Sequence, residues 1–277
     1  MPDFGRPDWG FAIFAQIFPK KMISHAQLSK LTALREKKFR YKYRQFTVEG
    51  EKMVVELLSQ RRLKPLQVFA TEVFFEKNGP ILSKIGERAQ LVTEAELKKI
   101  SALTTPNQAL AVCEMPDSPP DCAKNLENGW HFYLDGIQDP GNLGTIWRLA
   151  DWFGVPNLLC SPTTADAWNP KTVQASMGAF LRVGATEIEL DELLKTTPPG
   201  LPVLGATMDG RDIFSEKKRF NGGGLLVIGR EGAGLSAEIL GKLTDRVSIP
   251  RDPAGGAESL NAAIAAGILM AVLKSRP

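Results

Sequence analysis

Apolar residues along the chain follow two successive patterns, which predict two domains. In the first, the segments ISHAQLSKLTALREKK and EKMVVELLSQRR have helical spacing, and QFTVEG, LQVFAT, AQLVT and ALAVCEM are strand-like. TEAELKKISAL adds a helix whose start is marked by the capping-box pair Thr93 and Glu96. These elements predict a small mixed α/β domain over residues 22–114.

The second pattern begins at Trp130 and alternates strands with helices. HFYLDG, NLLCSP, LPVLGATMDG, LLVIG and RVSIP are predicted strands, and GTIWRLADWFG, VQASMGAFL and ESLNAAIAAGILMAVLK are predicted helices. Such alternation favours a largely parallel sheet with ligands at the carboxyl ends of its strands. We therefore expect a second α/β domain over residues 129–277.

Two segments lie outside these patterns. Residues 115–128 are rich in Pro, Asp and Asn and lack apolar periodicity, which is typical of a domain linker. Residues 1–21 contain the apolar run FAIFAQIF without a basic flank or cleavage site, so a signal peptide is not indicated. Either these residues are a genuine N-terminal extension, or Met22 is the natural initiator.

Composition excludes several classes of protein. The 277 residues are 43% hydrophobic and 23% charged, as in a globular protein. The net charge of +3 is too small to indicate by itself that the protein binds nucleic acid. Cys113, Cys122 and Cys160 form no CxxC pair, and the two histidines are far apart, so neither a metal site nor a disulfide framework is expected. No apolar run reaches the roughly 20 residues that span a bilayer. We expect a cytoplasmic protein without a metal.

The segment GIQDPGNLG has the glycine spacing of a phosphate-binding loop but lacks its chemistry. Gly136 and Gly141 are correctly spaced, whereas Asn142 and Leu143 occupy the positions of the required Lys and Ser/Thr, and no GxGxxG is present. An NTPase and a nucleotide-dependent dehydrogenase are therefore excluded. Two interpretations remain: a tight turn with Asn142 as helix N-cap, or a site formed by Asn142 and Arg148. Six residues rotate a helix by about 600°, so these two side chains do not share one face.

Two later segments carry polar groups after buried strands. In LLVIGREGAGLS, Gly229 ends a strand, Glu231 follows and Ser236 is a predicted N-cap, which suits either a plain corner or a ligand-binding loop. In VSIPRDPAGGAESLNAAIAAGILM, Ser259 and Asn261 open a helix and are caps on the simplest interpretation. The small residues that follow predict close approach to another helix or another subunit.

Together, and in this order, the three segments resemble the three motifs of the SpoU (TrmH-like) branch of the SPOUT methyltransferases. Motif 1 is DPGNLGTIWRLADWFGV with Asn142 and Arg148, motif 2 is VIGREGAGLS with Glu231, and motif 3 is SIP…ESLNAAIAAG with Ser259 and Asn261. CSPTTADAWNPKTVQASMGAF resembles the connecting region of the family, and the whole resemblance covers residues 129–274. The link RDPAGGAE within motif 3 is longer than is usual in the family, so it bears on cofactor affinity.

The resemblance implies a fold, a cofactor and a reaction. It implies a SPOUT domain with a parallel sheet and a deep trefoil knot, a homodimer through this domain, and S-adenosylmethionine as methyl donor to ribose 2′-hydroxyls of ribosomal or transfer RNA. The implied catalytic residues are Arg148, Asn142, Glu231 and Asn261. The implied cofactor-binding residues are Gly205, Ala206, Thr207, Ile228, Gly229, Ile249, Ser259 and Leu260. We expect Arg148, oriented by Glu231, to stabilise the developing alkoxide, because a guanidinium stays protonated and makes a poor base.

A basic and aromatic run, KLTALREKKFRYKYR, lies near the start of the first domain. Phe39, Tyr41 and Tyr43 are interleaved with cations, and Glu36 is the single acid. Cations neutralise phosphates and aromatic rings stack on unpaired bases, so the run predicts RNA binding; the alternative is a solvated helix end with core aromatics. The predicted RNA-binding residues are Lys30, Arg35, Lys37, Lys38, Arg40, Lys42 and Arg44. The helix–FTVEG–helix order resembles the L30e-like domain that many SpoU enzymes carry.

These observations favour an RNA 2′-O-ribose methyltransferase over a catalytically silent RNA-binding or ribosome-associated protein that retained the fold. The motif residues Asn142, Arg148, Glu231, Ser259 and Asn261 are all present, which disfavours the silent alternative. The two-domain layout favours 23S ribosomal RNA over transfer RNA as the substrate.

Overall fold

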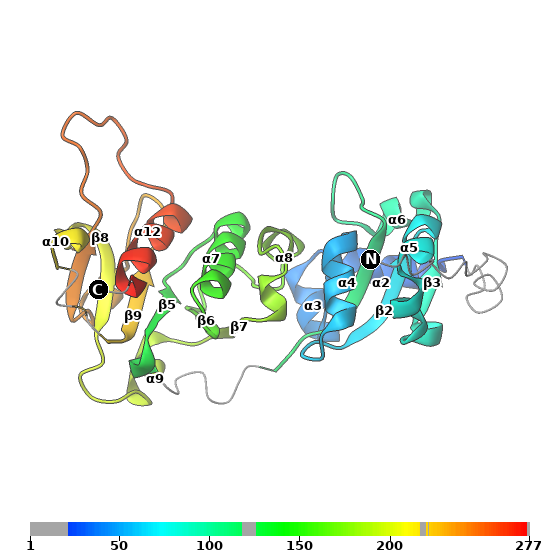
Figure 1. Cartoon of the computed structure of the whole chain (residues 1–277), viewed down its shortest axis with the longest axis horizontal. Helices are drawn as coiled ribbons and strands as arrows, with labels where there is room; N and C mark the ends of the chain where they lie inside the picture. The colour runs from blue at the N-terminus through cyan, green and yellow to red at the C-terminus, as the bar shows by residue number, and fades with distance from the viewer. Residues whose placement is uncertain (1–21, 118–125, 217–219, 221, 276–277) are drawn as a thin grey trace, which may run out of the picture. The chain divides into compact units, whose positions relative to one another are not determined.

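The computed structural model describes residues 22–117, 126–216, 220 and 222–275, which form two compact units (Figure 1). The boundary between the units falls between Pro116 and Asp117, inside the predicted linker. The predicted N-terminal extension, residues 1–21, and linker residues 118–125 lie outside the described residues.

The N-terminal unit is a four-stranded sheet covered by helices. Strands β1 and β2 are antiparallel to β4, and β3 is parallel to β2, in the order β1-β4-β2-β3. The elements are α2 (His25–Ala33), α3 (Lys37–Tyr43), β1 (Gln45–Glu49), α4 (Glu51–Ser59), β2 (Pro65–Ala70), α5 (Glu72–Ser83), η1 (Gly86–Arg88), β3 (Ala89–Leu91), α6 (Glu94–Ile100) and β4 (Ala109–Glu114). Leu31 of α2 and Leu97 of α6 pack in one cluster with Phe69 and Leu110 of the sheet.

Two helices of this unit differ from the prediction. The single helix expected over ISHAQLSKLTALREKK is divided into α2 and α3, because Glu36 adopts an extended backbone conformation. Helix α5 was not predicted; it contains Pro80, and it is kinked at Asn78, which has non-helical backbone angles. The predicted capping box of α6 is confirmed: Thr93 Oγ1 accepts from Glu96 N at 3.2 Å, and Glu96 Oε2 accepts from Thr93 N at 2.9 Å.

The C-terminal unit contains the predicted parallel sheet. Its six strands follow the order β10-β8-β9-β5-β6-β7, and every pair is parallel. The elements are η2 (Leu126–Asn128), β5 (Trp130–Leu134), α7 (Pro140–Trp152), β6 (Asn157–Cys160), α8 (Pro170–Ala175), η3 (Ala179–Leu181), β7 (Gly184–Glu187), α9 (Leu190–Lys195), β8 (Val203–Asp212), α10 (Ile213–Glu216), β9 (Gly224–Ile228), α11 (Ala237–Leu240), β10 (Asp245–Ser248) and α12 (Ala262–Lys274).

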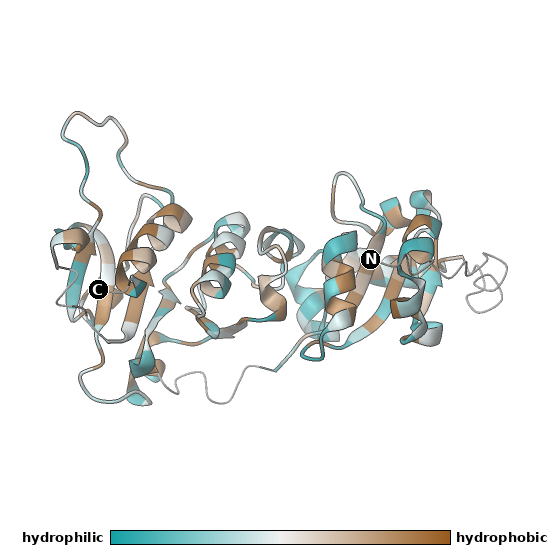
Figure 2. Cartoon of the chain, viewed as in Figure 1, coloured by the Kyte–Doolittle hydropathy of each residue, from teal (hydrophilic) through white to brown (hydrophobic). Residues whose placement is uncertain are grey.

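Helices cover both faces of this sheet. Leu193 of α9 and Ile239 of α11 pack with Tyr133, Leu159 and Val227 in one core cluster. Helices α7 and α12 contact each other and the strands on the other side (Figure 1). Helix α12 is apolar along most of its length (Figure 2), and its Gly267 faces Leu149 of α7. The predicted close approach of this small-residue helix to another helix is therefore found within the unit.

The start of α7 corrects one predicted cap. Asp139, not Asn142, is the N-cap: its Oδ1 accepts from Asn142 N at 2.9 Å, and Pro140 follows as the first helical residue. This hydrogen bond, with the neighbouring Lys171, lowers the pKa of the Asp139 carboxyl. Asn142 thus lies in the first helical turn, where its side chain is available for tertiary contacts.

The helix predicted over VQASMGAFL is also shorter than expected. It ends at Ala175, because Met177 and Gly178 have positive φ values of 51° and 91° and no α-helix continues through such angles. The trefoil knot stays a prediction, since strand pairing alone does not fix how a chain is threaded. Within the described part of the chain, no helix combines the length and apolarity needed to cross a membrane.

Candidate functional site

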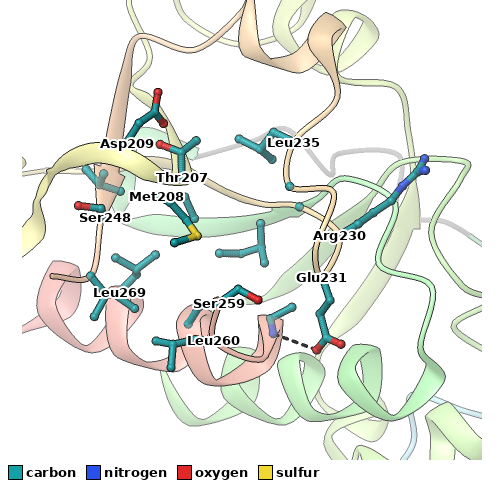
Figure 3. Close-up of a pocket in the computed structure, with 18 of the residues that line it drawn as sticks. Thr207, Met208, Asp209, Arg230, Glu231, Leu235, Ser248, Ser259, Leu260 and Leu269 are labelled. Carbon is teal, nitrogen blue, oxygen red and sulfur yellow. Dashed lines mark hydrogen bonds between the residues drawn. The ribbon is translucent and has the colours of Figure 1, made fainter. Parts of the chain in front are cut away.

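A cavity of about 580 Å³ opens beside strands β8, β9 and β10 (Figure 3). Because these strands are parallel neighbours, the segments that follow β9 and β10 meet at one edge of the sheet. The first turns of α12 close the cavity on another side. Binding sites for small molecules are typically concave and mostly apolar with a few polar groups, as this cavity is.

The predicted cofactor residues gather at this cavity. All of them except Gly205 line it, namely Ala206, Thr207, Ile228, Gly229, Ile249, Ser259 and Leu260. Gly205 lies on β8 outside the lining and faces Leu235 and Leu243. At Gly229 an added Cβ would lie 2.5 Å from the carbonyl group of Gly234, so only glycine lets the two sides of this loop approach so closely.

Apolar side chains complete the wall, and the sequence analysis did not assign them to the site. Met208, Leu235 and Leu269 line the cavity, and Figure 3 shows the Met208 thioether directed into it. Met208 is 69% exposed although it belongs to a strand. The sequence offered one signal for Met208: it is a large apolar residue directly after the predicted cofactor residues of GATMDG.

The cavity carries an unsatisfied hydrogen-bonding group. The Oγ1 atom of Thr207 is buried and has no hydrogen-bond partner among the described residues. The Asp209 carboxylate lies nearby, but the two groups do not meet hydrogen-bond geometry. Buried hydroxyls are normally paired with protein, water or a ligand. An unpaired hydroxyl in a largely apolar wall fits S-adenosylmethionine, which has polar amino-acid and nucleoside groups to pair with it.

Three predicted catalytic residues form one hydrogen-bonded cluster beside the cavity. Glu231 Oε1 accepts from Asn142 Nδ2 at 2.7 Å, from Asn261 Nδ2 at 2.7 Å and from the Ala262 backbone N at 3.2 Å. Asn261 Nδ2 also donates to Asn142 Oδ1 at 2.8 Å. We call Asn142, Glu231 and Asn261 the polar triad.

The start of α12 holds the triad in place. Asn261 is the N-cap of this helix, and its Oδ1 accepts from Ala263 N at 3.0 Å and Ile264 N at 3.2 Å. A carboxylate at a helix N-terminus is stabilised by the aligned peptide dipoles, which explains how Glu231 stays in this position. Asn261 is therefore a helix cap that also bonds to Asn142 and Glu231, and its catalytic role stays a prediction.

Arg148 is separate from the triad. It lies on the exposed side of α7, whereas the adjacent Trp147 is buried, donates to Val183 O at 3.2 Å and packs edge-to-face on Trp168. Within the described residues Arg148 makes no hydrogen bond or ion pair with Glu231, whose Oε1 is engaged by the triad. The expected orientation of Arg148 by Glu231 is therefore not found.

The basic run of the N-terminal unit is divided by burial. Lys30, Arg35, Lys37, Lys38, Lys42 and Arg44 are exposed. Arg40 is only 1% exposed, and its Nη1 donates at 2.8 Å to the carbonyl oxygens of both Leu34 and Arg35. Arg40 thus joins α2 to α3, which corrects its prediction as an RNA ligand.

The aromatic residues of the run support cations above them. Phe39 and Tyr43 stack with ring centroids 6.0 Å apart, and the Nζ atoms of Lys30 and Lys42 lie 5.4 Å and 5.7 Å from the Tyr43 centroid. These half-buried rings are partly core residues, as the alternative interpretation held. The exposed cations around them remain a basic surface.

Comparison with known proteins identifies the family. The model of the SpoU rRNA methylase family matches residues 129–271, which include every member of the polar triad. The chain belongs to the SpoU rRNA methylase family. The predicted family and enzyme class are thereby confirmed. The model of the MRM3-like substrate-binding domain matches residues 26–111.

Individual relatives of this SpoU protein agree. It is 32% identical over 238 residues to the 23S rRNA (guanosine(2553)-2′-O)-methyltransferase RlmP of Bacillus subtilis, covering 86% of this chain and 91% of the relative. A TrmH-family RNA methyltransferase structure from Porphyromonas gingivalis is 36% identical, with a TM-score of 0.75 over 91% of this chain and 98% of that one. An AdoMet-bound rRNA methyltransferase from Sinorhizobium meliloti is 27% identical, with a TM-score of 0.77 over 91% and 96% of the two chains.

Proposed function

We propose that this protein transfers the methyl group of S-adenosylmethionine to a ribose 2′-hydroxyl of 23S ribosomal RNA. The observation that carries the proposal is the polar triad beside a cavity with an unpaired hydroxyl. The cofactor supplies an electrophilic methyl group. Ala206, Thr207, Ile228, Gly229, Ile249, Ser259 and Leu260 hold it, as their position in the cavity lining supports.

The chain's own residues have to prepare a weak nucleophile. In the transfer the bond from the ribose oxygen to the methyl carbon would form as the carbon–sulfur bond of the cofactor breaks, with the hydroxyl proton passing to water, so negative charge develops on the ribose oxygen. Arg148, exposed on α7, stabilises that charge with a guanidinium that stays protonated. The triad keeps the loop after β9 and the start of α12 fixed, so that the entrance to the cavity keeps its shape.

The RNA is bound first through the N-terminal unit. The exposed Lys30, Arg35, Lys37, Lys38, Lys42 and Arg44 form a basic surface that can neutralise phosphates. The match to a substrate-binding domain over residues 26–111 supports this role. The name of the B. subtilis relative supports 23S ribosomal RNA, while transfer RNA stays the alternative substrate.

We further propose that the enzyme works as a homodimer in the cytoplasm. Two large apolar side chains on the packed helices α7 and α12 are exposed, Trp152 by 83% and Ile264 by 55%. Apolar surface of this kind is typical of interfaces, and a second copy of the C-terminal unit would cover it.

The test is transfer of labelled methyl from S-adenosylmethionine to unmodified 23S ribosomal RNA transcribed in vitro, followed by mapping of methylated riboses. We expect label at one ribose, and none in RNA from cells that contain the protein. Label in transfer RNA alone would replace the substrate, and RNA binding without transfer would establish the catalytically silent alternative. Sedimentation of the full chain tests the dimer.

A further inference from the structure

Arg230 lies next to the triad, and the predicted site residues do not include it. It follows the buried end of β9 and precedes Glu231, but Figure 3 shows the two side chains leaving the loop in different directions. Glu231 reaches towards α12, whereas the Arg230 side chain extends away from it, on the other side of the loop. The loop therefore directs the Glu231 carboxylate towards α12 and the Arg230 guanidinium away from it.

Both the backbone and the guanidinium of Arg230 contact neighbouring residues. Its backbone pairs with Gly234 through two hydrogen bonds, Arg230 N to Gly234 O at 3.0 Å and Gly234 N to Arg230 O at 2.9 Å. Its guanidinium rests on Gly136, where an added Cβ would lie 2.5 Å from Arg230 Nε. Gly136 has a φ of +70° and donates its N–H to Ser161 Oγ at 2.9 Å, so the surface beneath the guanidinium is itself held.

The charge of Arg230 is not compensated by the protein. Its side chain is exposed, and within the described residues it makes no ion pair. The carboxylates of the two adjoining loops have other partners: Glu231 is in the triad, Asp139 is 3.3 Å from Lys171 Nζ, and Asp135 accepts from Ser236 N at 2.8 Å. An unpaired guanidinium held over the loop between β5 and α7 is thus available to an anion from outside.

We propose that Arg230 binds a backbone phosphate of the RNA strand beside the ribose that is methylated. This inference rests on the proposed function, which brings an RNA ribose to the triad and Arg148. Every ribose in the strand is flanked by phosphates, and a guanidinium can hold one of them through two parallel N–H···O hydrogen bonds. Arg230 then fixes the register of the strand, while the basic surface of the N-terminal unit supplies further affinity.

A structural role for Arg230 makes different predictions. If its side chain only shields Gly136 from water, its removal changes the stability of the fold and the cofactor site, not the salt dependence of RNA binding. If it binds a phosphate, removal lowers RNA affinity and the number of counterions released on binding. The Arg230→Lys variant separates these two roles further, because lysine keeps the positive charge but lacks the two parallel N–H donors of a guanidinium.

The experiment compares Arg230→Gln and Arg230→Lys with the wild type and with a charge-matched control, Lys195→Gln. Lys195 is an exposed cation at the end of α9, after the edge strand β7. Methyl-transfer kinetics are measured with unmodified 23S ribosomal RNA transcript, RNA binding is titrated at several salt concentrations, and cofactor binding is followed by calorimetry. Thermal unfolding of each variant reports on the fold.

We expect Arg230→Gln to raise the KM for RNA by roughly fivefold to tenfold and to reduce the slope of log K against log salt by about 0.7. Cofactor affinity and thermal stability stay at wild-type values, Arg230→Lys restores the slope but not the whole KM, and Lys195→Gln behaves as the wild type. Wild-type RNA affinity and slope in Arg230→Gln would overturn the inference, as would a loss explained by lowered stability. If the wild type transfers no methyl group to any RNA, the proposed function fails, and the binding slopes still decide the role of Arg230.

Discussion

Glu231 Oε1 lies 2.7 Å from Asn142 Nδ2, although the two residues are 89 positions apart in the sequence. The first belongs to the loop after β9 and the second to the first turn of α7. One oxygen atom therefore joins the segments that the sequence shows as separate motifs. This oxygen accepts the hydrogen bonds from Asn142, Asn261 and the Ala262 backbone, so the triad depends on an acceptor at this position and not on the second carboxylate oxygen.

Substitution of Glu231 tests that division of roles. Glu231→Ala removes the acceptor of three N–H groups, so we expect a loss of about 1–3 kcal/mol in unfolding free energy. We expect methyl transfer to fall by roughly 100-fold, because the entrance to the cavity loses its shape. Glu231→Gln keeps an acceptor at Oε1 and should retain most of the stability and more of the activity. Equal inactivity of the two variants in the labelled-methyl assay would mean that the charge itself is required.

Arg148→Ala is expected to abolish methyl transfer, with a loss of roughly 100-fold or more, while cofactor binding survives. The Arg148 side chain is exposed, lies outside the cavity lining and has no partner in the triad. Its removal should therefore disturb neither the cofactor cavity nor the triad. Arg148→Lys keeps the charge and should recover part of the rate. Loss of S-adenosylmethionine binding in calorimetry would show that the catalytic assignment is wrong.

Thr207→Val replaces the unpaired hydroxyl by a methyl group of similar size. Because Thr207 Oγ1 has no partner in the protein alone, we expect thermal stability to stay the same or to rise. A hydrogen bond to the bound cofactor would be lost, so its Kd should increase by about threefold to tenfold. Unchanged cofactor affinity, measured by calorimetry, would place the hydroxyl outside the binding contacts.

Lys42→Glu and Arg40→Ala should separate RNA binding from folding in the basic run. Lys42 is exposed, so its reversal should weaken RNA binding strongly at low salt and leave thermal stability near the wild-type value. Arg40 is buried and donates to two carbonyl groups, so its removal should lower the unfolding free energy by about 1–3 kcal/mol. A Lys42→Glu variant with wild-type RNA affinity would contradict the proposed RNA surface.

The strands, the long helices and the triad residues were predictable because their patterns are local. A run such as LLVIG is apolar at every position, as a strand buried on both faces must be, and it becomes β9. The assignment of Asn142, Glu231 and Asn261 to one site came from the resemblance of their three segments to the SpoU motifs, because each segment alone also suited a plain cap or corner. The capping box at Thr93 was found because a cap depends on residues three positions apart.

The remaining features depend on contacts between distant segments. Nothing in KKFRYKY distinguishes Arg40 from its exposed neighbours, because its burial follows from how α2 and α3 meet. The Asp139 cap competed with Asn142, and both residue types are good caps. Arg230 was hidden as one charge in a glycine-rich corner, since only the folded chain shows that it rests on Gly136.

The hydrogen bond between Asn261 and Asn142 spans 119 positions, and its donor lies at the very start of α12. Contacts between residues so far apart are slow to form, because the entropy of closing a long loop opposes them. During synthesis, a nascent chain that has not yet exposed α12 contains Arg148 and most of the sheet but no triad. The candidate site is therefore incomplete without α12, however much of the sheet and of α7 has already folded.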